Sequence, residues 1–135
     1  MDGRSLGPVQ LIQELYAAFG RGDVPCILDA CSDDVVWTQV GPQGMDYAGT
    51  FKGKEGVGRW FGMVAANDVI REFEPREFFG GDDHCTVIGW ERTADAKTGK
   101  EFTSDWLHNF QVKNGKVTRW IGAFDSDARA RMAQT

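Results

Sequence analysis

The first half of the chain carries apolar side chains at the spacing of helices. Residues 9–19 place them three or four apart, which forms one apolar face, and Pro8 stands where a helix accepts proline, in its first turn. Asp23 can cap a second, shorter helix that contains Pro25 in its first turn. Residues 57–64 show the same spacing and predict a third helix, which its glycines weaken.

Strand-like patterns dominate the second half. They mark residues 35–40, 69–79, 84–93, 102–112 and 117–124. Residues 32–34 have the composition of a turn, residues 41–53 that of a loop, and Asn114-Gly115 is a strong signal for a tight hairpin. Pro75 removes a backbone donor, so its strand lies at a sheet edge or is bulged. This order predicts an α+β domain, in which two or three helices cover one face of a curved sheet that contains a four-stranded antiparallel meander.

The segment 102–112 places a row of mostly aromatic and apolar side chains on one face of its strand. The row consists of Phe102, Ser104, Trp106, His108, Phe110 and Val112. His108 is its single ionisable group, and a face of this kind can wall a pocket for a small apolar molecule. The opposite face holds residues 103, 105, 107, 109 and 111 and is too polar for a sealed core. We predict that it forms a polar, partly hydrated interface of a symmetric homodimer.

Length and composition narrow the class of protein. The 135 residues suit a single domain, 1–135, with one core. A net charge of −5 without a basic stripe argues against nucleic acid as a partner. No apolar run approaches the roughly 20 residues that cross a bilayer, so we expect no membrane partner. The first eight residues lack the apolar stretch of a signal peptide and the three cysteines fit reduced thiols, so we expect a cytoplasmic protein. The sequence contains no cofactor-binding fingerprint and no metal-ligand cluster, so we expect neither group.

Several segments resemble the nuclear transport factor 2-like (NTF2-like) superfamily, and within it the SnoaL-like, ketosteroid-isomerase-like branch. The resemblance rests on FGRGD at 19–23, SDDVVW at 32–37, FKGKEGV at 51–57 and the ending NGKVTRW at 114–120. It covers about residues 9–125 and implies a cone-shaped α+β fold, with N-terminal helices on a strongly curved, mostly antiparallel sheet around an apolar pocket. It also implies a homodimer.

The resemblance allows the catalytic groups of that branch to be checked one by one. In ketosteroid isomerases a tyrosine of the first helix, a basic aspartate of the first strand and a neutral aspartic acid act together. The corresponding positions here are Leu15, with Tyr16 one residue out of register, Gln39 and His108. Gln39 cannot abstract a proton, so the resemblance does not extend to that reaction.

Two other chemistries of the superfamily depend on carboxylates. Arg92 matches the arginine of limonene-epoxide-hydrolase-like members, but Ala94 and Gly122 stand where their two aspartates would be. SnoaL-like cyclases use a carboxylate in the pocket, whereas Asp105 and Asp125 lie on the opposite parity from the aromatic row. The sequence therefore predicts no acid or base in the pocket other than His108.

His108 is accordingly the candidate acid or base, because an imidazole exchanges protons near neutral pH and burial favours its neutral form. The alternative is a core histidine with a structural hydrogen bond. The expected ligand-binding residues are Leu15, Trp37, Gln39, Phe61, Trp90, Arg92, Trp106, Trp120 and Phe124. Gln39 either orients a ligand carbonyl or is a polar rim residue. Arg92 either binds a carboxylate ligand or stacks on the Trp90 ring, or else it forms a salt bridge with Glu72 or Glu91 or is solvated.

Two functions remain open at this point. The first is cofactor-independent isomerase, cyclase or lyase chemistry on a small apolar cyclic compound. The second is a non-catalytic module of the same fold that binds a ligand or dimerises.

Overall fold

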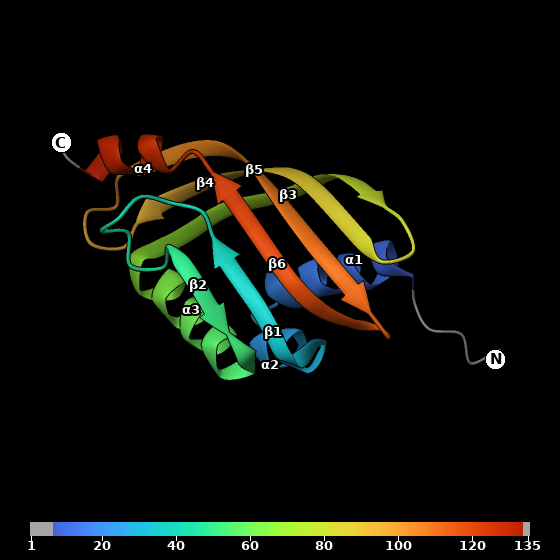
Figure 1. Ribbon diagram of the computed structural model, residues 1–135. Coiled ribbons are helices and arrows are strands. Elements are labelled where there is room, and N and C mark those ends of the chain that lie inside the picture. Colours follow the sequence, from blue (N-terminus) through green and yellow to red (C-terminus); the bar gives the residue numbers. More distant parts are fainter. Residues whose placement is uncertain (1–6, 134–135) are drawn as a thin grey trace.

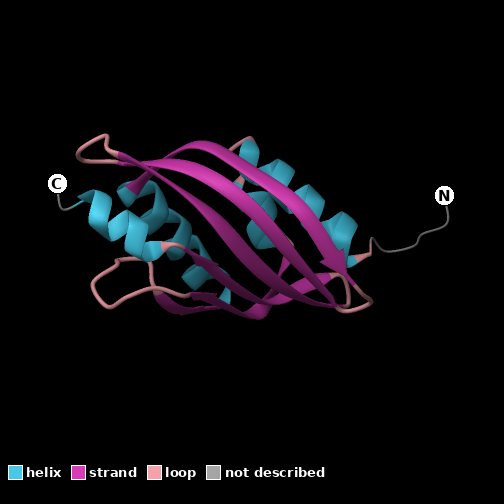
Figure 2. Cartoon of the chain, turned by 90° about the horizontal axis from the view of Figure 1, so that it is seen from above, coloured by secondary structure: helices cyan, strands magenta, loops and turns pink. Residues whose placement is uncertain are grey.

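Six strands form one curved, open sheet, and three helices pack against one of its faces (Figures 1 and 2). The computed structural model describes residues 7–133. Its helices are α1 (Pro8–Gly20), α2 (Val24–Asp29), α3 (Gly53–Asn67) and α4 (Ser126–Ala133). Its strands are β1 (Cys31–Gln39), β2 (Gly49–Lys52), β3 (Asp68–Gly80), β4 (His84–Asp95), β5 (Glu101–Lys113) and β6 (Lys116–Phe124).

The strand order is β2-β1-β6-β5-β4-β3. Strands β3 to β6 form the predicted antiparallel meander, and β1 joins it by parallel pairing with β6. The expected α+β architecture is therefore confirmed. No helix within residues 7–133 has the length and apolar character needed to span a membrane.

Three parts of the chain differ from the prediction. The expected turn at 32–34 belongs to β1, which begins at Cys31 and is bulged before Val36. The expected loop 41–53 contains β2, which pairs with the end of β1. The short helix α4 was not predicted, because its sequence has no apolar stripe and none of its residues is buried. The start of β1 and the whole of β2 are strands because β1 and β2 pair with other segments of the chain, and the local sequence gives little indication of that pairing.

Local signals identified the remaining elements correctly. The Asp23 carboxylate accepts a hydrogen bond from the backbone N–H of Cys26 at 3.1 Å and caps α2. Asn114 and Gly115 have φ angles of 52° and 75°, as a two-residue hairpin turn requires. Pro75 lies on the edge strand β3 beside a register shift, so both interpretations of this proline are confirmed.

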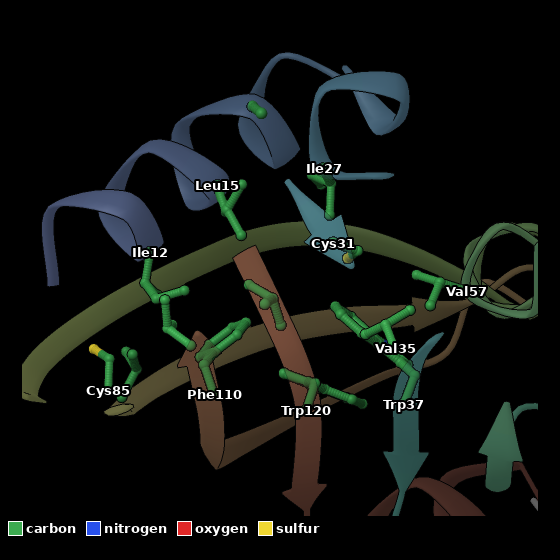
Figure 3. Packing of buried hydrophobic residues seen from close by; sticks show 14 of the residues in the cluster. Ile12, Leu15, Ile27, Cys31, Val35, Trp37, Val57, Cys85, Phe110 and Trp120 are labelled. Atoms are coloured by element: carbon green, nitrogen blue, oxygen red, sulfur yellow. The ribbon is translucent and has the colours of Figure 1, made fainter. Parts of the chain in front are cut away.

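The core lies between the helices and the sheet. Ile12 and Leu15 of α1 and Ile27 of α2 point toward the sheet, where Phe110 and Trp120 belong to the same buried cluster (Figure 3). This packing removes large apolar side chains from water and fixes the distance between the helices and the strands.

Candidate functional site

A cavity of about 100 Å³ lies on the helix-covered face of the sheet. An engineered cavity of roughly 150 Å³ binds benzene, so the volume is of the order that one ring needs. Eight of the expected site residues line it: Leu15, Trp37, Gln39, Phe61, Trp106, His108, Trp120 and Phe124. Tyr16, Trp60 and Phe73 also contribute to its mostly aromatic wall.

The wall is built from stacked rings on neighbouring elements. Trp37 of β1 stacks on Trp120 of β6 with ring centroids 4.6 Å apart, and Trp60 of α3 lies 5.0 Å from Trp120. On the other side, Trp106 stacks on Phe73 at 4.7 Å and on His108 at 4.1 Å. Flat side chains packed in this way form a surface suited to a flat ligand.

Two glycines leave room for these rings. A Cβ atom built on Gly89 would collide with the Trp106 indole, and one built on Gly122 would collide with the Trp120 indole. The Cα register places Gly89 opposite Trp106 and Gly122 opposite His108. Each indole therefore lies over a bare stretch of backbone, which lets the sheet curve around the cavity.

His108 forms a hydrogen bond with Tyr16. The Tyr16 Oη atom lies 2.7 Å from Nδ1 of the imidazole. Burial lowers the pKa of His108 to about 3 and raises the pKa of Tyr16 well above 10, so both groups are neutral at pH 7. The motif spacing assigned the first-helix position to Leu15, but it is Tyr16 that reaches His108. Leu15 also lines the cavity and is 5% exposed.

Gln39 has a structural role in the sheet. Its side-chain amide donates hydrogen bonds to the backbone carbonyls of Val40 at 3.1 Å and Gly122 at 3.3 Å, and the residue is 5% exposed. Both amide hydrogens are thereby used, and the bond to Gly122 joins the end of β1 to β6.

Trp90 and Arg92 do not line the cavity, and their assignment to it was wrong. They lie opposite Asp105 and Thr103, on the outer face of the sheet. Arg92 forms ion pairs there with Glu72 at 2.8 Å and Glu101 at 2.9 Å, and the Arg76 guanidinium lies 5.2 Å from the centroid of Trp90. The β4–β5 register pairs odd positions of β4 with even positions of β5, so the inward residues of β4 are the odd ones.

The correct register brings Glu91 to the cavity, which the sequence-based prediction missed. Thr93 donates a hydrogen bond from Oγ1 to Oε1 of Glu91 at 2.6 Å. Burial raises the pKa of Glu91 from its usual range, and the hydrogen bond from Thr93 offsets part of that change. The prediction that no carboxylate would lie in the pocket was therefore wrong. The signal that could have identified it is the strand pairing, because residues 87, 89, 91 and 93 of β4 lie opposite members of the even-numbered row of β5.

Asp68 is a second carboxylate at the cavity, and it is well compensated. It accepts hydrogen bonds from Tyr47 Oη at 2.5 Å and from Arg129 Nε at 2.9 Å. The Arg129 side chain is 13% exposed and that of Asp68 is 7% exposed, so α4 brings a cation onto an otherwise buried charge. Within residues 7–133 no cluster of histidine, cysteine and acidic side chains is suited to a metal ion.

Comparison with protein families matches residues 12–120 to the SnoaL-like domain. The chain belongs to this family. A crystal structure of an NTF2-like protein from Burkholderia xenovorans is 28% identical, with a TM-score of 0.81 over 92% of this SnoaL-like chain and 93% of that one. The structure of TerC co-crystallized with polyporic acid is 28% identical, with a TM-score of 0.82 over 94% of this chain and 98% of that one. Comparison with curated proteins gives no match.

Proposed function

We propose that this SnoaL-like protein binds a small, largely apolar ring compound and transfers a proton to or from it through His108 and Tyr16, without a cofactor. The observation that carries the proposal is the neutral pair formed by these two side chains in an aromatic cavity. An ionisable pair inside such a cavity is a common feature of sites for proton transfer.

The pair has two neutral arrangements. In one, Tyr16 donates its hydroxyl proton to Nδ1, and Nε2 of His108 carries the ring proton. In the other, Nδ1–H donates to Tyr16, Nε2 has a free lone pair, and the tyrosine hydroxyl proton is available to a ligand. The first arrangement becomes the second when Nε2 gives its proton to the ligand, Tyr16 passes its own proton to Nδ1, and the phenolic oxygen takes a proton from the ligand. If these three transfers are concerted, no charge forms on the pair, which suits a site where burial disfavours charged forms.

A relative supports the choice of ligand class. TerC, at 28% identity, was co-crystallized with polyporic acid. The aromatic cavity of the present protein is compatible with a ring compound, and polyporic acid is therefore one probe for it.

A second candidate is a binding module without catalysis. The low pKa of His108 favours this candidate, because a base whose protonated form has a pKa of about 3 accepts a proton weakly. The two candidates differ in whether a bound ligand exchanges protons.

Proton exchange can be measured with cyclohexanone in D₂O, by following its α-protons with NMR. We expect wild-type protein to accelerate the exchange. The rate with His108→Gln should be about 10²–10⁴-fold lower than with wild type. His84→Gln, a change of the exposed second histidine, is the matched control. Saturable quenching of tryptophan fluorescence by polyporic acid, together with no exchange of any ketone, would favour the binding module.

We also propose that the outer face of β5 forms a homodimer interface. Leu107 at its centre is 52% exposed and lies opposite Ile88 and Ala123 on the neighbouring strands. The flanking residues Thr103, Asp105 and Gln111 are polar and exposed. A small apolar centre with a polar rim is the usual arrangement of a moderate protein–protein interface.

A further inference from the structure

Glu91 is a carboxylate of the cavity that the Tyr16–His108 pair does not use. It lies on the inward face of β4, opposite Ser104, whereas His108 lies opposite Val87. These positions are four residues apart along β5, which corresponds to about 13 Å along the strand. Glu91 therefore faces a different part of the ligand space from His108.

The hydrogen bonds of Glu91 leave one oxygen available. Oε1 accepts the 2.6 Å hydrogen bond from Thr93. For Oε2, the part of the chain that the structure describes supplies no hydrogen-bond donor. Because a carboxylate has about four lone-pair positions and Glu91 lines the cavity, it retains acceptor capacity for a ligand bound there.

The neighbouring charges are already paired elsewhere. Arg129 is engaged by Asp68 and Asp95, and Arg92 turns to the outer face, toward Glu72 and Glu101. Among residues 7–133, no ion pair joins Glu91 to a cation. The nearby Asp68 carboxylate adds repulsion, so Glu91 is the less compensated of the two acids.

An uncompensated carboxylate in apolar surroundings favours any ligand that brings a hydrogen-bond donor to it. We propose that Glu91 accepts a hydrogen bond from a hydroxyl group on the ligand ring, and that this contact selects hydroxylated rings over bare ones. The inference rests on the proposed function, since it requires that the cavity bind a ring compound. A ring without a donor leaves the acceptor of Glu91 without a partner in the occupied cavity, so the preference will be measurable.

Phenol and toluene provide a matched pair of probes, because they have nearly the same size and shape and differ by a hydroxyl in place of a methyl group. Their dissociation constants can be measured by NMR titration with wild-type protein, Glu91→Leu and Glu91→Gln. The control variant is Glu77→Leu, which changes an exposed glutamate of β3. Benzylamine is a third probe, for a ligand that offers an ammonium group in place of a hydroxyl.

We expect the preference of wild-type protein for phenol over toluene to fall about tenfold or more in Glu91→Leu. Glu91→Gln should show an intermediate preference, because an amide oxygen still accepts a hydrogen bond, and Glu77→Leu should match wild type. A retained preference in a folded Glu91→Leu protein would overturn the inference, and a folded Glu91→Gln protein would test it if the leucine variant does not fold.

Three other results are also decisive. Binding of both rings with equal affinity by wild-type protein would overturn the role of Glu91 and leave the proposed function intact. If phenol, toluene and polyporic acid all fail to bind, both the role of Glu91 and the proposed function are overturned. If benzylamine binds more tightly than phenol, and Glu91→Leu removes that difference, the partner of Glu91 is an ammonium group. That result would overturn the assignment of a ligand hydroxyl.

Discussion

The Trp106 indole lies directly over the backbone of Gly89, and no other residue type fits beneath it. A Cβ atom at position 89 would collide with Cζ2 and Cε2 of the indole and with the carbonyl oxygen of Glu74. Trp106 itself is fully buried. The position of this ring, and through it those of Phe73 and His108, therefore depends on a glycine in the adjacent strand.

Gly89→Ala should lower the free energy of unfolding by about 1–3 kcal/mol, because it overpacks the wall of the cavity. Gly62→Ala is the control, since Gly62 lies in α3 and a methyl group added there would meet no atom within 4 Å. Alanine in a helix should raise the free energy of unfolding there by about 0.5–1 kcal/mol. Urea denaturation measures both, and equal effects of the two changes would contradict the packing argument.

The low pKa of His108 predicts a dependence of stability on pH. In the unfolded chain the imidazole takes up a proton below about pH 6.5. In the folded protein it does so only near pH 3. Stability should therefore fall as the pH is lowered through this window, by at most about 1.4 kcal/mol per pH unit. His108→Gln should lose that part of the slope, and parallel stability curves for wild type and variant between pH 7 and pH 4 would argue against a buried neutral histidine.

The same pKa values make a prediction for activity. If the Tyr16–His108 pair transfers protons, the exchange rate should stay nearly constant from pH 5 to pH 9, because neither group changes its charge in that range. Tyr16→Phe should reduce the rate while it preserves most of the binding of a ring ligand, since the aromatic surface is kept. A rate that rises through pH 6.5 would instead point to an ordinary, solvated histidine.

Arg129 should contribute more to stability than any other residue of α4. Arg129→Met leaves the Asp68 carboxylate buried without its cation and should lower the free energy of unfolding by about 3–5 kcal/mol. Arg131→Met breaks an ion pair whose side chains are 65% and 76% exposed, so its effect should stay below about 1 kcal/mol. Thermal unfolding of both variants tests this difference, and similar melting temperatures would contradict it.

The proposed dimer can be tested with a charge at its centre. Leu107→Lys should convert a dimer into a monomer, as measured by light scattering at tens of micromolar, because it places a charge in the apolar part of the interface. Val40→Lys changes an equally exposed side chain, 51% against 52%, at a different place and should leave the mass unchanged. A wild-type protein of monomer mass would rule the interface out.

The contrast between β5 and β4 shows what the sequence could and could not predict. In β5 the alternation of large and polar side chains is strong, so Trp106 and His108 were placed on the cavity side correctly. In β4 the inward positions include Gly89 and Glu91, whereas a tryptophan lies on the outer face, so hydrophobicity indicated the wrong face. The face is set by the connection 96–100, where Asp95 N–H donates to the Lys100 carbonyl at 2.8 Å and thereby fixes the register.

Tyr16 illustrates a different limit. Its position on the inward stripe of α1 was predicted, but its contact with His108 joins residues 92 positions apart and depends on the angle at which the helix crosses the sheet. The motif spacing identifies the turn of α1 that faces the cavity, but it does not determine whether Leu15 or Tyr16 contacts His108. For this reason the fold was predictable from the sequence to a much greater degree than the partners of its ionisable groups.

The parallel pairing of β1 with β6 has a consequence for the synthesis of the protein. Val36 lies beside Arg119, so an early segment of the chain completes its sheet only when nearly the last one is available. During translation β1 can pair early with β2, and Trp37 can meet Trp60 and Phe61 of α3. The edge of β1 that pairs with β6 stays open until residues 116–124 have left the ribosome. A nascent chain stalled before that point would present the open edge of β1 and would lack Trp120, the ring on which Trp37 stacks.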